Sequence, residues 1–197
     1  MMPQLAKSIV GGTTIIEEDV RSVSSIFSKQ IASLALAAGK KVAYLTTGIK
    51  QDTIDSGKVF KFELDGCVEE LRQETFALNS HDNLKNADLI VIDSFSVYIF
   101  NKSEAEIVEL ITEICRAAKE GKSFILTYEG RMLPSTVDAY IKSVVDTIIT
   151  IKADFVGSKI NRLIFVQKIK GAKPYDKLVK FTVESDGIQI DTRELIG

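Results

Sequence analysis

The chain has 197 residues, 45% of them hydrophobic, and a formal net charge of -2, which predicts one soluble domain with a sizeable core. Its two cysteines, Cys67 and Cys115, lack C-x-x-C spacing, which excludes a disulfide framework and a thiolate metal site and favours a reducing compartment. The sequence contains no apolar run long enough for a signal peptide or a membrane span, so we expect a cytoplasmic protein without membrane insertion.

Apolar runs of strand length alternate with segments of helical periodicity up to residue 146, which is typical of α/β construction. We expect buried strands at residues 13–16, 42–46, 88–93 and 123–127, and a half-exposed strand at 58–64. Helices are expected at residues 25–38, 68–78, 103–120 and 135–145. Ser103 followed by Glu106 forms a capping box at the third helix. The periodicity places these apolar residues inward: Phe27, Ile31, Leu34 and Ala38; Ile107, Ile111, Ile114 and Ala118; Val137, Ile141 and Val144.

The pattern changes after residue 146, where strands follow one another without helices between them. We expect these strands at residues 147–151, 163–167, 178–183 and 188–190, separated by turn residues. The sequence therefore predicts a single domain over residues 1–197, with a βαβ core in 1–146 and a C-terminal β-meander in 147–197.

The strand that ends at Asp93 and Ser94 has the form of a Walker B strand, which presents a carboxylate to a magnesium nucleotide. Such a strand predicts a phosphate-binding loop upstream, of the form G-x-x-x-x-G-K-[ST]. Counting back along the chain, this octad falls on Glu18-Asp19-Val20-Arg21-Ser22-Val23-Ser24-Ser25. Both glycines and the lysine are missing, and only the final hydroxyl, Ser25, survives. The sequence therefore predicts a nucleotide-binding scaffold whose phosphate loop is degenerate.

The acidic residues Glu17, Glu18 and Asp19 precede the first helix, where a phosphate would otherwise bind. Their charges would repel ATP, yet each contributes about 0.3–1 kcal/mol to the helix through its macrodipole. An ordinary helix start explains the acidic turn better than a catalytic role does. For Asp93, a structural role and a vestigial Walker B role remain equally open. We expect no metal and no cofactor, and MgATP only if the loop is not degenerate.

The order and spacing of these segments resemble those of the RecA-like ATPases, and among them the KaiC-like group with its FlaH-like archaellum accessory proteins. The carriers of the resemblance are residues 88–96, 124–128, 133–135, 145–149, 165–171 and 181–188. The resemblance implies a three-layer α/β core with a mainly parallel sheet and C-terminal antiparallel β-hairpins. It also implies that Asp93 and Ser94 occupy the Walker B position.

The same resemblance bears on catalysis and on assembly. Thr46-Thr47-Gly48-Ile49-Lys50 lacks the glutamate that usually activates water at the end of the second core strand. Lys168 and Lys170 match a basic pair that reaches across a subunit interface, so we expect them opposite Glu17, Glu18 and Asp19 of another copy.

The preferred hypothesis is a catalytically inactive KaiC/FlaH-like protein that serves as a structural or regulatory subunit in an archaeal-type assembly, as a homo-oligomer or with a protein partner. One alternative is a DNA-recombination accessory that resembles archaeal RecA paralogues. Residues 152–180, with eight Lys or Arg and two Asp, would then contact DNA, although we expect weak nucleic-acid binding or none. A second alternative is a residual ATPase completed in trans.

Overall fold

A nine-stranded sheet runs through the computed structural model of this chain, which describes residues 11–18, 23–46, 53–55, 58–60, 68–70, 82–156, 159–173, 178–184 and 187–190. Its strand order is β11-β10-β9-β8-β1-β7-β6-β2-β5. The strands are β1 (Thr13–Glu18), β2 (Val42–Thr46), β5 (Val68–Glu70), β6 (Leu89–Asp93), β7 (Ser123–Tyr128), β8 (Thr147–Val156), β9 (Lys159–Lys168), β10 (Val179–Glu184) and β11 (Gly187–Ile190). Pairing is parallel from β8 to β5 and antiparallel from β8 to β11.

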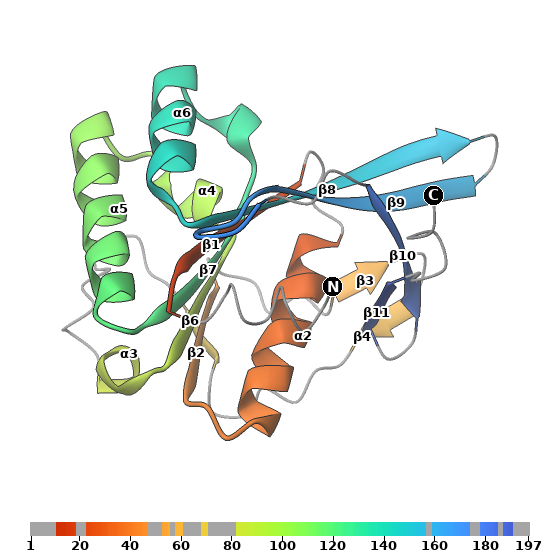
Figure 1. Cartoon of the computed structure of the whole chain (residues 1–197), viewed down its shortest axis with the longest axis horizontal. Coiled ribbons are helices and arrows are strands. Elements are labelled where there is room, and N and C mark those ends of the chain that lie inside the picture. Colours follow the sequence, from red (N-terminus) through yellow and green to blue (C-terminus); the bar gives the residue numbers. More distant parts are fainter. Residues whose placement is uncertain are drawn as a thin grey trace.

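Helices cover both faces of the sheet and complete a three-layer arrangement (Figure 1). The helices are α2 (Ser24–Ala37), α3 (Asp82–Asn86), α4 (Phe95–Ile99), α5 (Glu104–Lys119) and α6 (Ser135–Val144), with a 3-10 turn at Gly130–Met132. The helices α4, α5 and α6 pack on one face, and α2 packs on the other. The expected α/β core with C-terminal antiparallel hairpins is confirmed. No helix in the described part of the chain is long and apolar enough to cross a membrane.

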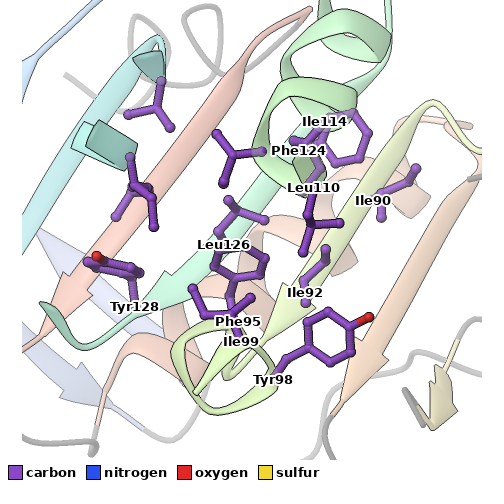
Figure 2. Packing of buried hydrophobic residues seen from close by; sticks show 14 of the residues in the cluster. Ile90, Ile92, Phe95, Tyr98, Ile99, Leu110, Ile114, Phe124, Leu126 and Tyr128 are labelled. Atoms are coloured by element: carbon purple, nitrogen blue, oxygen red, sulfur yellow. The ribbon is translucent and has the colours of Figure 1, made fainter. Parts of the chain in front are cut away.

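The two faces of the central strands supply two separate cores. Ile90 and Ile92 of β6 pack under α4 and α5, and Figure 2 shows them beside Phe124 and Leu126 of β7. The alternate residues of β6, Leu89 and Val91, belong to the cluster under α2. Because both faces of these parallel strands are covered, their sequences are continuously apolar, as predicted.

The helix α5 follows its sequence signals closely. Ser103 and Glu106 form the predicted capping box, and Ile107, Ile111, Ile114 and Ala118 are all buried. Gly121 has a φ of 104°, a left-handed conformation that suits glycine at a helix end.

Three inward assignments on other helices are wrong, and one of them is Ala38, which is exposed and lies just past the end of α2 at Ala37. Leu34 is 56% exposed, and the buried residues of α2 lie mainly in its N-terminal half. Alanine and leucine surround the second half of α2, so the apolar periodicity there does not single out one face. Val144 is 37% exposed, whereas Val145 is 1% exposed, because α6 ends at Val144 and the extended backbone of Val145 turns its side chain into the core.

The segment between β2 and α3 departs most from expectation. Residues 68–70 form β5 alongside β2, so the helix predicted at 68–78 is wrong there, and residues 71–78 lie outside the described part. The strand predicted at 58–64 is confirmed at β4 (Lys58–Phe60), and residues 61–64 lie outside the described part. This strand pairs with β3 (Thr53–Asp55), a strand that sequence analysis missed, in a separate two-stranded sheet. The short helices α3 and α4 were missed as well.

Gln30 of α2 holds the edge strand β11 in place. Its Oε1 accepts a hydrogen bond from the backbone N–H of Ile188 at 2.8 Å, and its Nε2 donates to the carbonyl oxygen of Ile188 at 3.3 Å. The side-chain amide therefore pairs with the strand backbone on the side that faces α2.

We expect Gln30→Leu to lower the free energy of unfolding by about 1–3 kcal/mol, because it leaves both backbone groups of Ile188 without this partner. Urea denaturation measures the loss. Hydrogen exchange should quicken at the Ile188 amide and stay slow at Leu126 in the central strand β7. Unchanged protection of Ile188 would show that Gln30 does not anchor β11.

Candidate functional site at the carboxyl ends of the central strands

The carboxylate of Asp93 lies at the end of β6 and is the centre of the candidate site. Asp93 is 6% exposed, and three hydroxyl groups from three different elements donate hydrogen bonds to it. Ser25 Oγ of α2 and the Tyr44 hydroxyl of β2 donate to Oδ2 at 2.5 and 2.9 Å. Thr127 Oγ1 of β7 donates to Oδ1 at 2.8 Å. These bonds join the start of α2 to the middle of the sheet.

The hydroxyl of Tyr44 is fully enclosed in this cluster. The side chain is 1% exposed, and Ser28 Oγ lies 2.9 Å from the phenol oxygen. Burial raises the pKa of Tyr44 well above its ordinary value, and the negative charge of Asp93 is the second largest cause of this rise. Tyr44 is therefore held as a neutral donor to Asp93.

Ser94 follows Asp93 in a strained backbone conformation. Its φ and ψ are 68° and 40°, a left-handed region that costs a non-glycine residue roughly 1–2 kcal/mol. The backbone N–H of Ser94 donates to Thr127 Oγ1 at 2.6 Å, so Thr127 contacts both Ser94 and Asp93. This sharp turn begins α4 and fixes the position of Asp93 at the edge of the sheet.

Glu18 places a second buried carboxylate beside this cluster, at the N-terminus of α2. The residue is 5% exposed. Its carboxylate accepts hydrogen bonds from the backbone N–H of Val23, at 3.2 and 3.1 Å to its two oxygens, and from that of Ser24 at 2.8 Å. Free N–H groups at a helix N-terminus are the groups that bind phosphate in nucleotide-binding loops. Here the chain's own carboxylate occupies them.

The remaining residues of the predicted octad and of the acidic turn have different surroundings. Asp19, Val20, Arg21 and Ser22 lie outside the described residues. Glu17 pairs with Lys142 of α6 at 2.6 Å, and Lys142 also pairs with Asp138 at 3.1 Å. Burial lowers the pKa of Lys142, but hydrogen bonds to both carboxylates outweigh burial and raise this pKa overall.

Lys168 and Lys170 contact α6 and the turn that follows it. The Lys168 ammonium donates to the carbonyl oxygens of residues 142 and 143 at the end of α6, at 3.2 and 2.7 Å. Lys170 pairs with Asp146 at 3.1 Å. Lys168 lies beside Ile148 in the sheet, whereas Glu17 and Glu18 lie beside Thr150 and Ile151, and the contacts of the two lysines described here are with α6 and Asp146. Their contact with a neighbouring copy stays a prediction.

Chemically, the site consists of the Asp93 carboxylate, which is enclosed by neutral hydroxyls. Next to it lies the N-terminus of α2, whose N–H groups are bound by the Glu18 carboxylate. The structure brings together Asp93, Ser94, Glu18 and Ser25, which sequence analysis had singled out. It adds Tyr44 and Thr127, which sequence analysis missed. Each carries a hydroxyl in a buried, mainly apolar strand, but Thr46, Ser123 and Tyr128 in the same strands do so as well, so the hydroxyl alone did not single them out. The described residues contain no group of three or more His, Cys, Asp or Glu that could hold a metal ion.

This topology, with an aspartate on a central parallel strand beside the N-terminus of the first core helix, defines a RecA-like fold. The chain matches no protein-family model and no curated protein. Among solved structures it is similar to the flagellar accessory protein FlaH from Methanocaldococcus jannaschii, with a TM-score of 0.74 and 21% sequence identity over 95% of each chain. The likeness shows that the two chains share a fold.

The raised pKa of Tyr44 predicts a loss of stability at alkaline pH. A tyrosine that ionises more readily in the unfolded chain contributes stability below its unfolded pKa of about 10, and this contribution disappears as pH rises above that value. We expect Tyr44→Phe to be less stable at neutral pH, by about 1–2 kcal/mol for the lost hydrogen bonds. Its stability should also fall less steeply above about pH 10. Chemical denaturation across this range compares the slopes, and equal slopes would contradict the interpretation.

Proposed function

We propose that this protein is a RecA-fold subunit that neither binds MgATP tightly nor hydrolyses it, and that serves a structural or regulatory role in an archaellum-type assembly. The assembly part of the proposal rests on the fold shared with a flagellar accessory protein. The other part of the proposal is that the nucleotide site is silent, meaning that it neither binds MgATP tightly nor hydrolyses it. This part rests on the contacts of Glu18 and Asp93. In this proposal the functional ligand of the chain is a protein partner or a second copy of the chain, and not a nucleotide.

The hydrogen bonds of the Glu18 carboxylate are the observation that carries the proposal. It accepts bonds from the N–H groups of Val23 and Ser24, which fall within the octad where a phosphate loop is expected. A nucleotide phosphate would have to displace a buried carboxylate of the same charge sign. The missing loop lysine removes the cation that would compensate for this repulsion.

The hydrogen bonds of Asp93 support the same conclusion. In nucleotide-binding scaffolds the loop hydroxyl and the Walker B aspartate hold magnesium together. Here Ser25 Oγ donates directly to Asp93, and Tyr44 donates to the same carboxylate oxygen. Both protein groups are thus engaged with one another, and the role of Asp93 is to join α2 to the sheet.

We expect calorimetry to detect no binding of MgATP to the wild-type protein at micromolar concentrations. Glu18→Ala should lower the melting temperature, and inorganic phosphate or sulfate should restore part of the loss, because the anion replaces the removed carboxylate. Glu104→Ala is the matched control, since Glu104 lies at the N-terminus of α5 but is exposed.

A micromolar dissociation constant for MgATP would refute the silent site. If Glu18→Ala responds to phosphate no more than Glu104→Ala does, the carboxylate does not substitute for a phosphate. The assembly role is tested separately by gene deletion. Loss of swimming that the wild-type gene restores would support it, and unchanged motility would contradict an archaellum role.

The exposed lysines of the C-terminal strands favour a second candidate, a DNA-recombination accessory. Lys152, Lys170 and Lys173 are exposed at or beside the β8–β9 hairpin. Phosphate contacts by lysines weaken steeply with salt, so specific use of this surface would give tight, salt-sensitive binding. We expect fluorescence anisotropy to show only weak binding to single- or double-stranded DNA at physiological salt. Nanomolar affinity would favour the recombination role over the assembly role.

A further inference from the structure

The helix α5 presents an exposed face away from the sheet, at the outer edge of the molecule (Figure 1). Its buried residues, among them Ile107, Ile111 and Ile114, face the core. The opposite line of side chains is exposed and consists of Ala105, Glu109, Thr112, Arg116 and Lys119. The helix is 16 residues long, so this line extends for about 24 Å.

The charges along α5 are divided between its two halves. Glu104, Glu106 and Glu109 lie in the first half and Glu113 lies just past the midpoint, whereas the last turn carries Arg116 and Lys119. The helix dipole accounts for glutamates in the first turn and for basic residues in the last. It does not account for Glu109 and Glu113, which lie beyond the first turn and repel one another at i,i+4 spacing.

The adjoining surface of α6 is uncharged. Its exposed residues are Ser135, Thr136, Ala139, Ser143 and Val144. Val108 of α5 and Val144 of α6 are 38% and 37% exposed, although both are large and apolar. The Thr112 and Tyr140 hydroxyls lie 3.3 Å apart, so the two helices form one continuous surface. A charged ridge on α5 thus lies beside an uncharged strip of small, mostly hydroxyl-bearing residues, with Val108 and Val144 as its two exposed large apolar side chains.

We propose that the α5–α6 surface binds a second copy of this chain, with the two α5 helices antiparallel about a two-fold axis near Thr112. In that arrangement the acidic half of each α5 faces the basic half of the other. Glu109 of one copy then lies next to Arg116 of the second copy, and the reverse pair forms by symmetry. Val108 and Val144 supply apolar area beside these pairs. The inference does not depend on whether the nucleotide site is silent.

The size of the α5–α6 surface sets the affinity that we expect for the dimer. Two helices side by side offer roughly 500 Å² over a length of about 24 Å, which is less than the 800 Å² or so per partner of a standard interface. We therefore expect a reversible dimer that forms at high protein concentration and weakens with added salt, because exposed charge pairs are screened.

Two charge reversals test the arrangement sharply by sedimentation velocity of the full chain. Glu109→Lys makes the ridge of each copy entirely basic at the paired positions, and Arg116→Glu makes it entirely acidic. Each variant alone should dimerise about tenfold more weakly, or not at all. An equimolar mixture of the two should form a heterodimer, because the basic ridge of the Glu109→Lys variant then faces the acidic ridge of the Arg116→Glu variant. Circular dichroism and melting temperature verify that each variant is folded.

Lys152→Glu is the control, because it reverses an exposed charge on the β8–β9 hairpin, away from α5. It should leave dimerisation unchanged. The proposal is wrong if the wild-type chain stays monomeric at high concentration and low salt, or if the mixture of variants stays monomeric. It is also wrong if the dimer survives both reversals but is lost on Lys168→Glu with Lys170→Glu, which would assign association to the predicted basic pair.

Discussion

The buried carboxylate of Asp93 is the interaction on which the arrangement of this molecule depends. Its hydrogen bonds to Ser25, Tyr44 and Thr127 tie α2, β2 and β7 to the end of β6. An enclosed carboxylate without donors would be strongly unfavourable, so these hydroxyls and the aspartate require one another. The strained turn at Ser94 is tolerated because the same network fixes it on both sides.

The sequence predicts most of the core because buried parallel strands consist of consecutive apolar residues, which can be recognised without the structure. It predicts α5 in detail because the capping box and the apolar stripe are both local signals. It fails at β5, since pairing with β2 is a contact between distant segments that overrides local helical periodicity. It fails at Leu34 because alanines and leucines surround that part of α2 and Ser33 is the one polar residue in 31–38, which is too few to mark a solvent side.

The candidate site was predictable in part. The order of segments located Asp93 and Ser25, and it located Glu18 at a helix start. The bonds of Tyr44 and Thr127 to Asp93 depend on strand register, which places Thr46 beside Asp93 and turns Tyr44 two residues earlier toward α2. The orientation of the Glu18 carboxylate depends on side-chain geometry, which composition and charge do not encode. Charge predicted repulsion of phosphate, whereas the structure adds direct occupation of the helix N-terminus.

Glu18 also has a consequence in terms of mass action. A soluble anion leaves its site on dilution, but a carboxylate in the same chain keeps a fixed effective concentration, of millimolar order for short tethers. Any free phosphate compound must compete with this tethered ligand, whatever the metabolic state of the cell. In the proposed function, the start of α2 is therefore insulated from changes in nucleotide level. The proposed subunit would contribute a constant geometry to its complex, and any timing of assembly would come from elsewhere.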